Sequence, residues 1–221
     1  MSDDINVELI KENDVSQSDN YINFKIIIIG DSDVGKSCLL KRAVHDIFDE
    51  KYQATLGFEF LCMHFKVNEV KIKLQIWDTC GQETYRSLVQ GFYRNTSLGI
   101  IVYDINKKET YDEAGFWIKD IRNHIKEEIP LFVAGNKNDL ERKVPYEDAQ
   151  LFISSNRIKY FTECSAKTGK NVKELFEEAA KCLYKQYKEC KSKNIKSSIS
   201  EKKKIDLNKD DGLLKKKKKC C

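Results

Sequence analysis

The sequence predicts an α/β fold in which a mainly parallel β-sheet carries helices on both faces. Strand-like and helix-like segments alternate along most of the chain, and the purest apolar run, Ile26–Ile29, has the length of a strand. The short motifs that can bind a ligand follow predicted strands, as expected where ligands bind beyond the carboxyl ends of parallel strands. We expect a six-stranded sheet with one antiparallel edge strand.

The first predicted unit is a strand, a glycine-containing turn and a helix. Residues Phe24–Ile29 form a β-branched run that is predicted to be buried on both faces, as in a central parallel strand. After the turn, Ser37–Val44 is predicted to be helical. The next two strands, Phe60–Val67 and Val70–Trp77, flank Asn68-Glu69 and are predicted to form a hairpin.

The rest of the domain alternates strands and helices. Strands are expected at Leu98–Tyr103, Leu131–Ala134 and Ile158–Phe161. Helices are expected at Glu109–Ile125, Tyr146–Ser154 and Val172–Tyr187, the last with apolar residues at helical spacing. This alternation favours parallel pairing of the strands.

The chain has 221 residues, 41% of them hydrophobic and 33% charged, which suits one globular domain with tails. Residues 1–20 lack periodicity and are predicted to be a disordered extension. Residues 21–188 are the predicted domain. Residues 189–221 are predicted to be a flexible tail, because the chain is rich in Lys and Ser beyond Cys190.

Charge is distributed unevenly along the chain. Lys185–Cys221 carry 14 lysines against five acidic residues, a surplus of nine, so the preceding residues are at −5 within the net charge of +4. A mildly acidic body argues against a nucleic-acid-binding face, and the basic element is the tail.

Other features narrow the class of protein. No apolar run approaches the ~20 residues of a membrane-spanning helix, and the acidic start is unlike a secretory signal peptide. Six of the eight cysteines are scattered without metal-ligand spacing, so reduced thiols of a cytosolic protein are expected.

The segment Gly30–Ser37 has the pattern of a phosphate-binding loop between a strand and a helix. Glycines let the backbone approach a polyphosphate, and the amides from Asp33 to Ser37 can point at it. Lys36 is expected to reach the β- and γ-phosphate oxygens, and the Ser37 hydroxyl to ligate Mg²⁺. The predicted nucleotide-binding residues of this segment are Asp33, Val34, Gly35, Lys36, Ser37 and Cys38.

A second motif, Asp78-Thr79-Cys80-Gly81-Gln82, ends the hairpin strand. We expect Asp78 to hold Mg²⁺ through a water, Gly81 to offer its amide to the γ-phosphate, and Gln82 to orient the attacking water. Lys36, Gly81 and Gln82 are therefore the predicted catalytic residues.

Two further motifs can recognise guanine. Asp139, in Asn136-Lys137-Asn138-Asp139, can accept hydrogen bonds from the ring N–H and the exocyclic amine of guanine, which adenine does not offer. In Ser165-Ala166-Lys167, the Ala166 amide can meet the guanine carbonyl oxygen. Lys137 and Lys167 can pack their stems along the base. Together the motifs predict a site for GTP or GDP with Mg²⁺ as the cofactor.

With these motifs the chain resembles the Ras superfamily of small GTPases, and within it the Rab family, over roughly Asn23–Leu183. The Rab-like residues are Thr55-Leu56-Gly57-Phe58-Glu59-Phe60, Lys73-Leu74-Gln75-Ile76-Trp77-Asp78-Thr79, Tyr85-Arg86-Ser87-Leu88 and the terminal Cys220-Cys221. The resemblance implies a P-loop small-GTPase fold and a two-state switch, in which the γ-phosphate holds two loops that hydrolysis releases.

The resemblance also implies roles for further residues. Thr55 is similar to the switch residue that ligates Mg²⁺ through its hydroxyl, and Phe48 to the aromatic residue that packs against guanine. Phe60, Trp77 and Phe92 resemble the apolar triad that presents an effector surface, although core or hairpin packing explains the same pattern. The resemblance implies a monomer with effectors, an exchange factor, a GTPase-activating protein and a prenyl-carrier (GDI-type) chaperone as partners.

The end of the chain is similar to doubly prenylated Rab tails. Five lysines precede Cys220 and Cys221, the predicted lipidation sites. Two lipid chains anchor a protein stably where one does not, and the lysines favour an anionic leaflet. The expected location is the cytoplasmic face of an intracellular membrane, in exchange with the cytosol.

Two residues depart from the family pattern. Asp33 stands where a small neutral residue is usual; its charge predicts weakened nucleotide affinity and fast exchange, unless a lysine from a partner or from the first switch neutralises it. Cys80 stands where alanine is usual and is either a tolerated small residue or a thiol that oxidants reach.

Two other functions are open at this point. One is a nucleotide-binding scaffold that scarcely cycles because of Asp33, against which Gln82 and Thr55 argue. The other is a P-loop small-molecule kinase, against which the guanine-reading motifs argue.

Overall fold

The computed structural model describes residues 5–16, 18–50, 58–79 and 91–210. The chain divides into two compact units, Met1–Leu183 and Tyr184–Cys221. The strands are β1 (Val7–Ile10), β2 (Ile22–Ile29), β3 (Phe58–Val67), β4 (Val70–Thr79), β5 (Leu98–Asp104), β6 (Leu131–Asn136) and β7 (Tyr160–Glu163). The helices are the short η1 (Glu12–Asp14), α1 (Lys36–His45), α3 (Lys108–His124), α4 (Tyr146–Ser155) and α5 (Val172–Asp210).

The sheet has seven strands in the order β1-β3-β4-β2-β5-β6-β7. The strands from β4 to β7 pair in parallel through β2, and β3 and β1 add two antiparallel pairings at one edge. Because parallel strands end together, the segments after β2, β4, β5, β6 and β7 meet at one edge of the sheet. The predicted α/β fold is confirmed.

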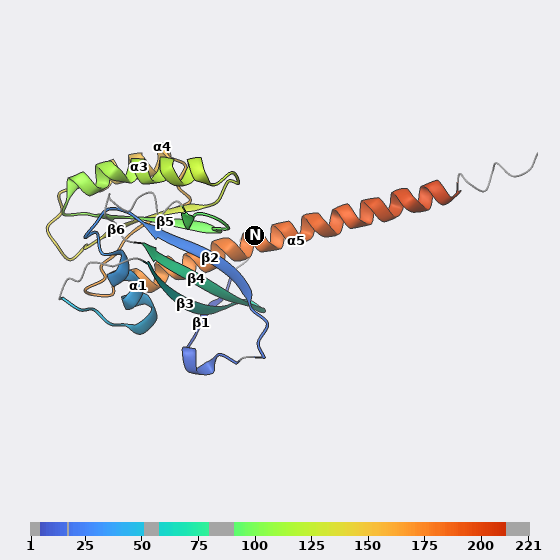
Figure 1. Ribbon diagram of the computed structural model, residues 1–221, viewed down its shortest axis with the longest axis horizontal. Helices are drawn as coiled ribbons and strands as arrows, with labels where there is room; N and C mark the ends of the chain where they lie inside the picture. The colour runs from blue at the N-terminus through green and yellow to red at the C-terminus, as the bar shows by residue number, and fades with distance from the viewer. Residues whose placement is uncertain (1–4, 17, 51–57, 80–90, 211–221) are drawn as a thin grey trace, which may run out of the picture. The chain divides into compact units, whose positions relative to one another are not determined.

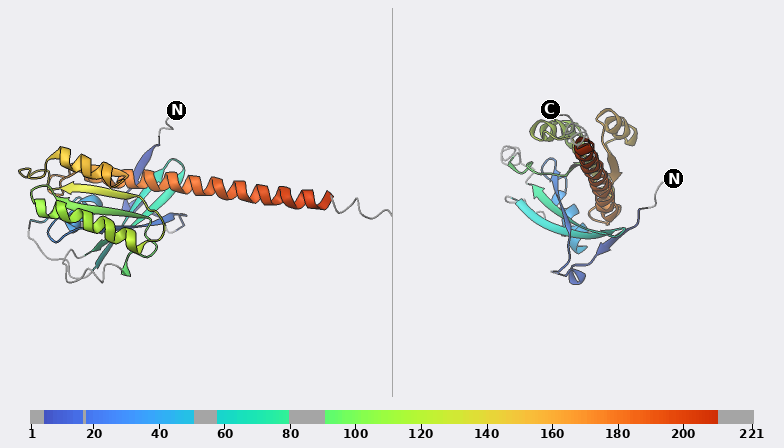
Figure 2. Two further views of the ribbon diagram at one scale, coloured as in Figure 1. Left: turned by 90° about the horizontal axis from the view of Figure 1, so that it is seen from above. Right: turned by 90° about the vertical axis from the view of Figure 1, so that its right-hand side faces the viewer.

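Helices cover both faces of the sheet in the unit Met1–Leu183. Figure 1 shows α3 and α4 on one face and α1 on the other, and Figure 2 gives the same layers from two further directions. Strand β2 contributes side chains to the core on both faces of the sheet, since its consecutive residues Ile26–Ile29 are all buried. Its odd-numbered isoleucines join the core beneath α3, where Trp117 is the largest side chain.

The predicted number of strands was wrong, because the N-terminal extension is not disordered throughout. Val7–Ile10 pairs antiparallel with His64–Val67 of β3 as a seventh strand. Asn6 and Asn68 exchange two hydrogen bonds where this strand begins, and Asp19 forms a 2.6 Å ion pair with Lys71. Four residues are too few to show a periodic pattern, so the pairing depends on the partner strand and not on local sequence.

The prediction of a flexible segment beyond Cys190 was wrong up to Asp210, where α5 ends. The sequence from Tyr184 contains neither proline nor glycine before Gly212 and is rich in good helix formers. Lysines also lie over aromatic rings one turn back: Lys188 Nζ is 5.9 Å from the Tyr184 ring centre and Lys191 Nζ is 5.8 Å from that of Tyr187. No helix in the described part of the chain is long and apolar enough to cross a membrane.

Candidate functional site

The glycine loop between β2 and α1 lies directly against the ends of two other strands. A Cβ on Gly30 would be 2.2 Å from the Val102 carbonyl oxygen on β5, and one on Gly35 would be 2.4 Å from Nδ2 of Asn136 on β6. Gly35 also has φ of +90°, which L side chains rarely adopt. Both glycines are therefore required by the close approach of the backbone, as the motif predicts.

Lys36 is buried at the centre of this loop. Its Nζ donates hydrogen bonds to the carbonyl oxygens of Gly30 at 2.8 Å and Asp31 at 2.6 Å. The first turn of α1 begins at the same residue, so an ammonium group and the amides at the start of a helix lie at one point. This combination suits an anionic ligand such as a phosphate.

Cys38 and Val34 have local roles beside this centre. Cys38 lies half-buried in the first turn of α1, and burial raises the pKa of its thiol. Val34 is fully buried, and its carbonyl oxygen accepts a hydrogen bond from Asn136.

The structure brings Ser37 and Asp78 together. The Ser37 hydroxyl donates a short hydrogen bond to Oδ2 of Asp78 at the end of β4. Asp78 is fully buried, and its other oxygen, Oδ1, has no hydrogen-bond partner among the described residues. Burial, opposed by Ser37 and Lys36, raises the pKa of the Asp78 carboxyl to about 6.

Ser37 and Asp78 fit Mg²⁺. Both offer oxygen ligands, and the buried Asp78 Oδ1 has no hydrogen-bond donor among the described residues, which a hydrated cation would supply. Within the described ranges no group of three or more His, Cys, Asp or Glu could hold a metal ion. Mg²⁺ is commonly held by one or two protein oxygens together with phosphates, so the small ligand set agrees with that ion.

Asn136 joins three of the four motifs. Its Nδ2 donates to the Val34 carbonyl oxygen at 2.8 Å, and its Oδ1 accepts from the Ala166 amide at 3.1 Å. Arg42 of α1 adds a second connection, with hydrogen bonds to the carbonyl oxygens of Ala166 at 2.8 Å and Lys167 at 2.9 Å. The glycine loop and the two guanine-reading loops therefore form one site.

The guanine-reading residues are held in place by one another. The buried Ser165 donates from its hydroxyl to Oδ1 of Asp139 at 2.5 Å, while Asp139 itself is exposed. This arrangement leaves an oriented carboxylate at the surface, as recognition of two N–H donors requires. The Ala166 amide, predicted to meet the guanine carbonyl oxygen, donates to Asn136 in this structure. Lys167 pairs with Glu50 at 2.9 Å.

Asp33 lies in a cluster of four charged groups. Its carboxylate pairs with Nζ of Lys107 at 2.7 Å and of Lys137 at 3.7 Å, and Lys137 also pairs with the buried Asp104 at 2.9 Å. Partial burial favours the neutral acid, but the hydrogen bond from Lys107 and the charge of Lys137 outweigh it, so the pKa of Asp33 falls below its ordinary value. Asp33 is therefore neutralised by lysines of this chain, Lys107 and Lys137. The sequence had suggested a lysine from a partner or from the first switch.

The three aromatic residues of the predicted effector surface are in contact. Ring centres of Phe60 and Trp77 are 5.2 Å apart, and those of Trp77 and Phe92 are 5.4 Å apart. Lys25 lies over Trp77 with Nζ 5.0 Å from the ring centre and donates to the Phe92 carbonyl oxygen at 2.5 Å. Phe60 is 44% exposed, so the stack reaches the surface at β3.

Several predicted site residues lie outside the described part of the chain. These are Thr55, Cys80, Gly81, Gln82, Cys220 and Cys221. Phe48 is described and half-buried after the end of α1.

Sequence reasoning missed four residues that build the site: Lys25, Arg42, Asp104 and Lys107. Their partners lie far away in the sequence, 124 residues for the Arg42–Ala166 hydrogen bond and 74 for the Lys107–Asp33 pair. No local motif signals such contacts. For Asp104 and Lys107, the sequence offered one indication of a role in the site. Both lie at the end of a strand that ends beside the glycine loop.

Comparison with models of protein families identifies a match to the Ras family over residues 25–185. The matched range includes all four motifs and ends within α5.

Proposed function

The chain belongs to the Ras family and is therefore a small GTPase, and we propose that it is a Rab-like switch that hydrolyses GTP slowly and recruits effectors at an intracellular membrane. The observation that carries the nucleotide-binding part is the pair of hydrogen bonds made by Asn136. They tie the loop suited to phosphates to the loop suited to guanine. One ligand that has both groups, a guanine nucleotide, matches this arrangement.

Each end of the site has a separate chemical task in this proposal. Lys36 and the first amides of α1 neutralise the β- and γ-phosphates, and Asp139 selects guanine. Gln82 orients the attacking water, and Gly81 and Thr55 respond to the γ-phosphate. Mg²⁺, held by Ser37, Thr55 and, through water, by Asp78, supplies charge neutralisation at the phosphates when it is bound.

The Rab-like part of the proposal rests on the stacked rings of Phe60, Trp77 and Phe92 and on the resemblance of the surrounding sequence. An exposed aromatic residue backed by two others is a suitable anchor for a partner protein. Phe60 lies on β3, which follows the predicted switch residue Thr55, and Trp77 lies on β4, which precedes the predicted switch residues Gly81 and Gln82. A nucleotide-dependent change there would alter the surface offered to an effector.

Membrane attachment is proposed from the tail. Prenyl groups on Cys220 and Cys221, with the preceding lysines, would anchor the chain to the cytoplasmic face of a membrane. A GDI-type chaperone is then needed to carry the lipids through the cytosol, and an exchange factor and a GTPase-activating protein to set the cycle. Mass spectrometry of the protein from its native cell tests the anchor, which two free thiols would refute.

The alternative of a scaffold that scarcely cycles has lost its main support. It rests on an unopposed charge at Asp33, whereas Asp33 is paired with Lys107 and Lys137. The small-molecule kinase is disfavoured by the family match, which covers the guanine-reading motifs.

Nucleotide selection is tested by competition against fluorescent GDP on the full chain. Unlabelled GDP and GTP should displace the probe and ATP should not. Asp139→Ala should weaken GDP binding by about 100-fold or more, because the two N–H donors of guanine lose their acceptor. Asp112→Ala, an exposed carboxylate on α3, is the matched control and should bind as the parent does. Equal displacement by ATP would contradict the proposal.

Hydrolysis is tested by single-turnover release of phosphate from bound GTP. We expect a slow rate in the parent that Gln82→Leu lowers by about tenfold or more, since the water loses its orienting group. Gln150→Leu on the exposed surface of α4 is the control. Equal rates for Gln82→Leu and the parent would remove Gln82 from the mechanism.

A further inference from the structure

The charged groups around Asp33 indicate a function for Lys107, a residue that lies outside the four motifs. Asp33 lies inside the glycine loop, two residues before Gly35, with φ of +63°. The left-handed conformation is one that aspartate tolerates better than most residues. Its carboxylate therefore belongs to the loop that binds the polyphosphate, and its charge has the same sign as the ligand.

Two lysines from two other strand ends meet this carboxylate. Lys107 follows β5 and precedes α3, and its Nζ is 2.7 Å from Oδ2 of Asp33. Lys137 follows β6, and its Nζ is 3.7 Å from Oδ1. Each oxygen of Asp33 thus has its own cation.

Asp104 fixes the position of one of these lysines. It is 1% exposed, and its Oδ2 is 2.9 Å from Nζ of Lys137 while its Oδ1 accepts from the Asn106 amide at 2.8 Å. Lys137 therefore already has a closer anionic partner than Asp33. Lys107 makes the shorter contact with Asp33 and is the cation that balances it.

The four groups carry two negative and two positive charges and sum to zero. Without Lys107 the cluster would carry −1 beside the phosphates, and without Asp33 it would carry +1. Like charges a few ångström apart repel, and because the Lys107 and Asp33 side chains are 48% and 46% exposed, salt screens part of this repulsion. The balance of the cluster therefore bears on how firmly a polyphosphate is held.

We propose that Lys107 is a positioning residue for the nucleotide: it neutralises Asp33 and joins the glycine loop to the start of α3, and so slows nucleotide release. This inference rests on the proposed nucleotide-binding function. It explains how the site accommodates a carboxylate in a loop built for phosphates. Lys107 acts through Asp33 and needs no contact with the nucleotide.

The test measures release of fluorescent GDP from the full chain in Mg²⁺ with excess unlabelled GDP. Lys107→Ala should release GDP about tenfold faster, which corresponds to about 1.4 kcal/mol. The difference should shrink when ionic strength is raised from about 0.05 M to about 0.5 M. Lys108→Ala removes a charge one residue away that makes no ion pair among the described residues, and it should release at the parent rate.

A second variant separates this role from direct phosphate binding. Asp33→Asn keeps the shape of the side chain and tolerates the left-handed conformation. In an Asp33→Asn background, Lys107→Ala should change release by less than about twofold, because the charge that Lys107 balances is gone. The same tenfold acceleration in that background would mean that Lys107 binds the nucleotide itself and would overturn the proposal.

Other outcomes are equally informative. If Lys107→Ala releases GDP at the parent rate while the parent retains GDP, the proposal fails and the proposed function stands. If the parent chain does not retain GDP at all, both fail. Circular dichroism of each variant, which should match the parent because Lys107 is exposed, excludes loss of fold as the cause.

Discussion

The guanine end and the phosphate end of the site are built in different ways. At the guanine end, Asn136 is hydrogen-bonded to Val34 and Ala166, and Ser165 to Asp139, and none of these hydrogen bonds needs a ligand. At the phosphate end, Asp78 is buried with a raised pKa and an oxygen that has no partner among the described residues. The guanine end is therefore preorganised. At the phosphate end, the buried Asp78 carboxylate is fully balanced only when a cation and phosphates are bound.

This difference has a consequence for the ligand-free protein. Hydrogen bonds between buried groups stabilise the fold with or without nucleotide, while a buried carboxylate that Ser37 and Lys36 compensate only in part destabilises it until the ligand is present. The free energy available for binding is therefore concentrated at the phosphate end. Changes at the two ends should differ in sign as well as in size when the ligand-free protein is unfolded.

The largest effect on stability is expected from Asn136→Ala. It leaves two buried backbone groups, the Val34 carbonyl and the Ala166 amide, without their partner. At about 1–3 kcal/mol for each unsatisfied group, the free energy of unfolding should fall by about 2–6 kcal/mol. Urea unfolding of the nucleotide-free chain measures this. Asn23→Ala at an exposed position of β2 should change it by less than about 0.5 kcal/mol.

An Asn136→Ala protein as stable as the Asn23→Ala control would contradict this expectation. It would mean that the guanine end is also assembled by its ligand and is not preorganised.

The next largest effect on stability is expected from Asp78→Asn, which should stabilise the ligand-free protein where Asn136→Ala destabilises it. A carboxyl whose pKa is about 6 in the fold and 3.8 in the unfolded chain stabilises the fold below pH 3.8, and this contribution is lost as pH rises through about 6. Asp78→Asn removes that dependence. Above pH 6, without Mg²⁺ or nucleotide, the variant should therefore be more stable than the parent by on the order of 3 kcal/mol.

The measurement is urea unfolding in EDTA at several pH values from about 4 to about 7.5, which span the rise of the Asp78 pKa from 3.8 to about 6. Every other titrating group is common to both proteins, so the difference between the two curves isolates Asp78. Parallel curves would show that water or a nearby group already compensates the carboxylate.

The sequence predicted the contents of both ends but not the way they are connected. Short motifs whose chemistry is local contain Gly30, Lys36, Asp139 and Ser165. The strands before these motifs can be recognised in the sequence as apolar runs. The bridge from Asn136 to Val34 and the pairing of Asp33 join residues from different strand ends. Such contacts follow from the order of strands in the sheet, which the sequence gives only in outline.

The same reasoning explains the two errors in the fold. Strand β1 exists because the edge of β3 offers unpaired backbone groups, and this is a property of the sheet and not of Val7–Ile10. The extension of α5 to Asp210 shows that a lysine-rich composition fits a helix as readily as a linker.

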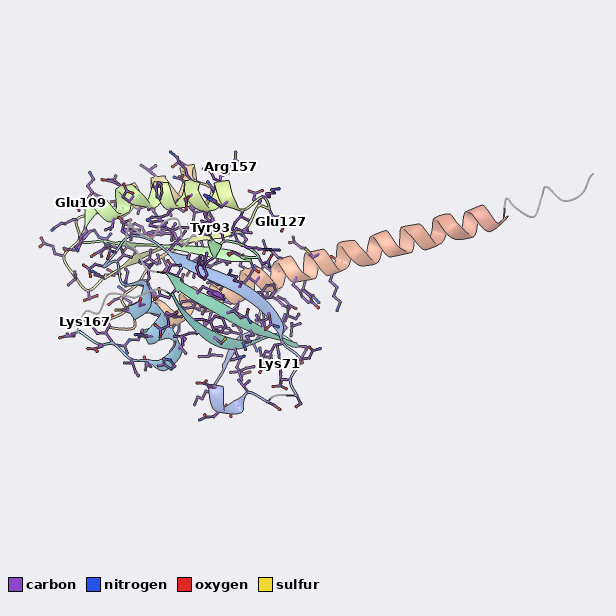
Figure 3. The ribbon with its side chains drawn as sticks, viewed as in Figure 1. Lys71, Tyr93, Glu109, Glu127, Arg157 and Lys167 are labelled. Carbon is purple, nitrogen blue, oxygen red and sulfur yellow. The ribbon has the colours of Figure 1, made fainter. Side chains whose placement is uncertain are left out.

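The smallest effect on the site is expected from removing β1, which changes the sheet at a distance from both ends of the site. Strand β1 pairs with His64–Val67, while the start of β3, Phe58, is the part that pairs beside the site with Thr79. Figure 3 likewise shows Lys71, the partner of the extension, at the opposite end of the sheet from Lys167. Deleting residues 1–10 should lower the free energy of unfolding by about 1–2 kcal/mol, because four cross-strand pairs are lost.

GDP affinity should be unchanged by that deletion, since β1 pairs with the end of β3 that lies away from Phe58 and Thr79. Urea unfolding and fluorescent GDP titration of the same preparation measure both quantities, with Lys71→Ala as a control that removes the ion pair to Asp19 and the contact with the Tyr21 ring but leaves β1 in place. A deletion that weakens GDP binding more than about threefold would mean that the edge strand supports the site through the hairpin. The site would then depend on the whole sheet and not only on its carboxyl edge.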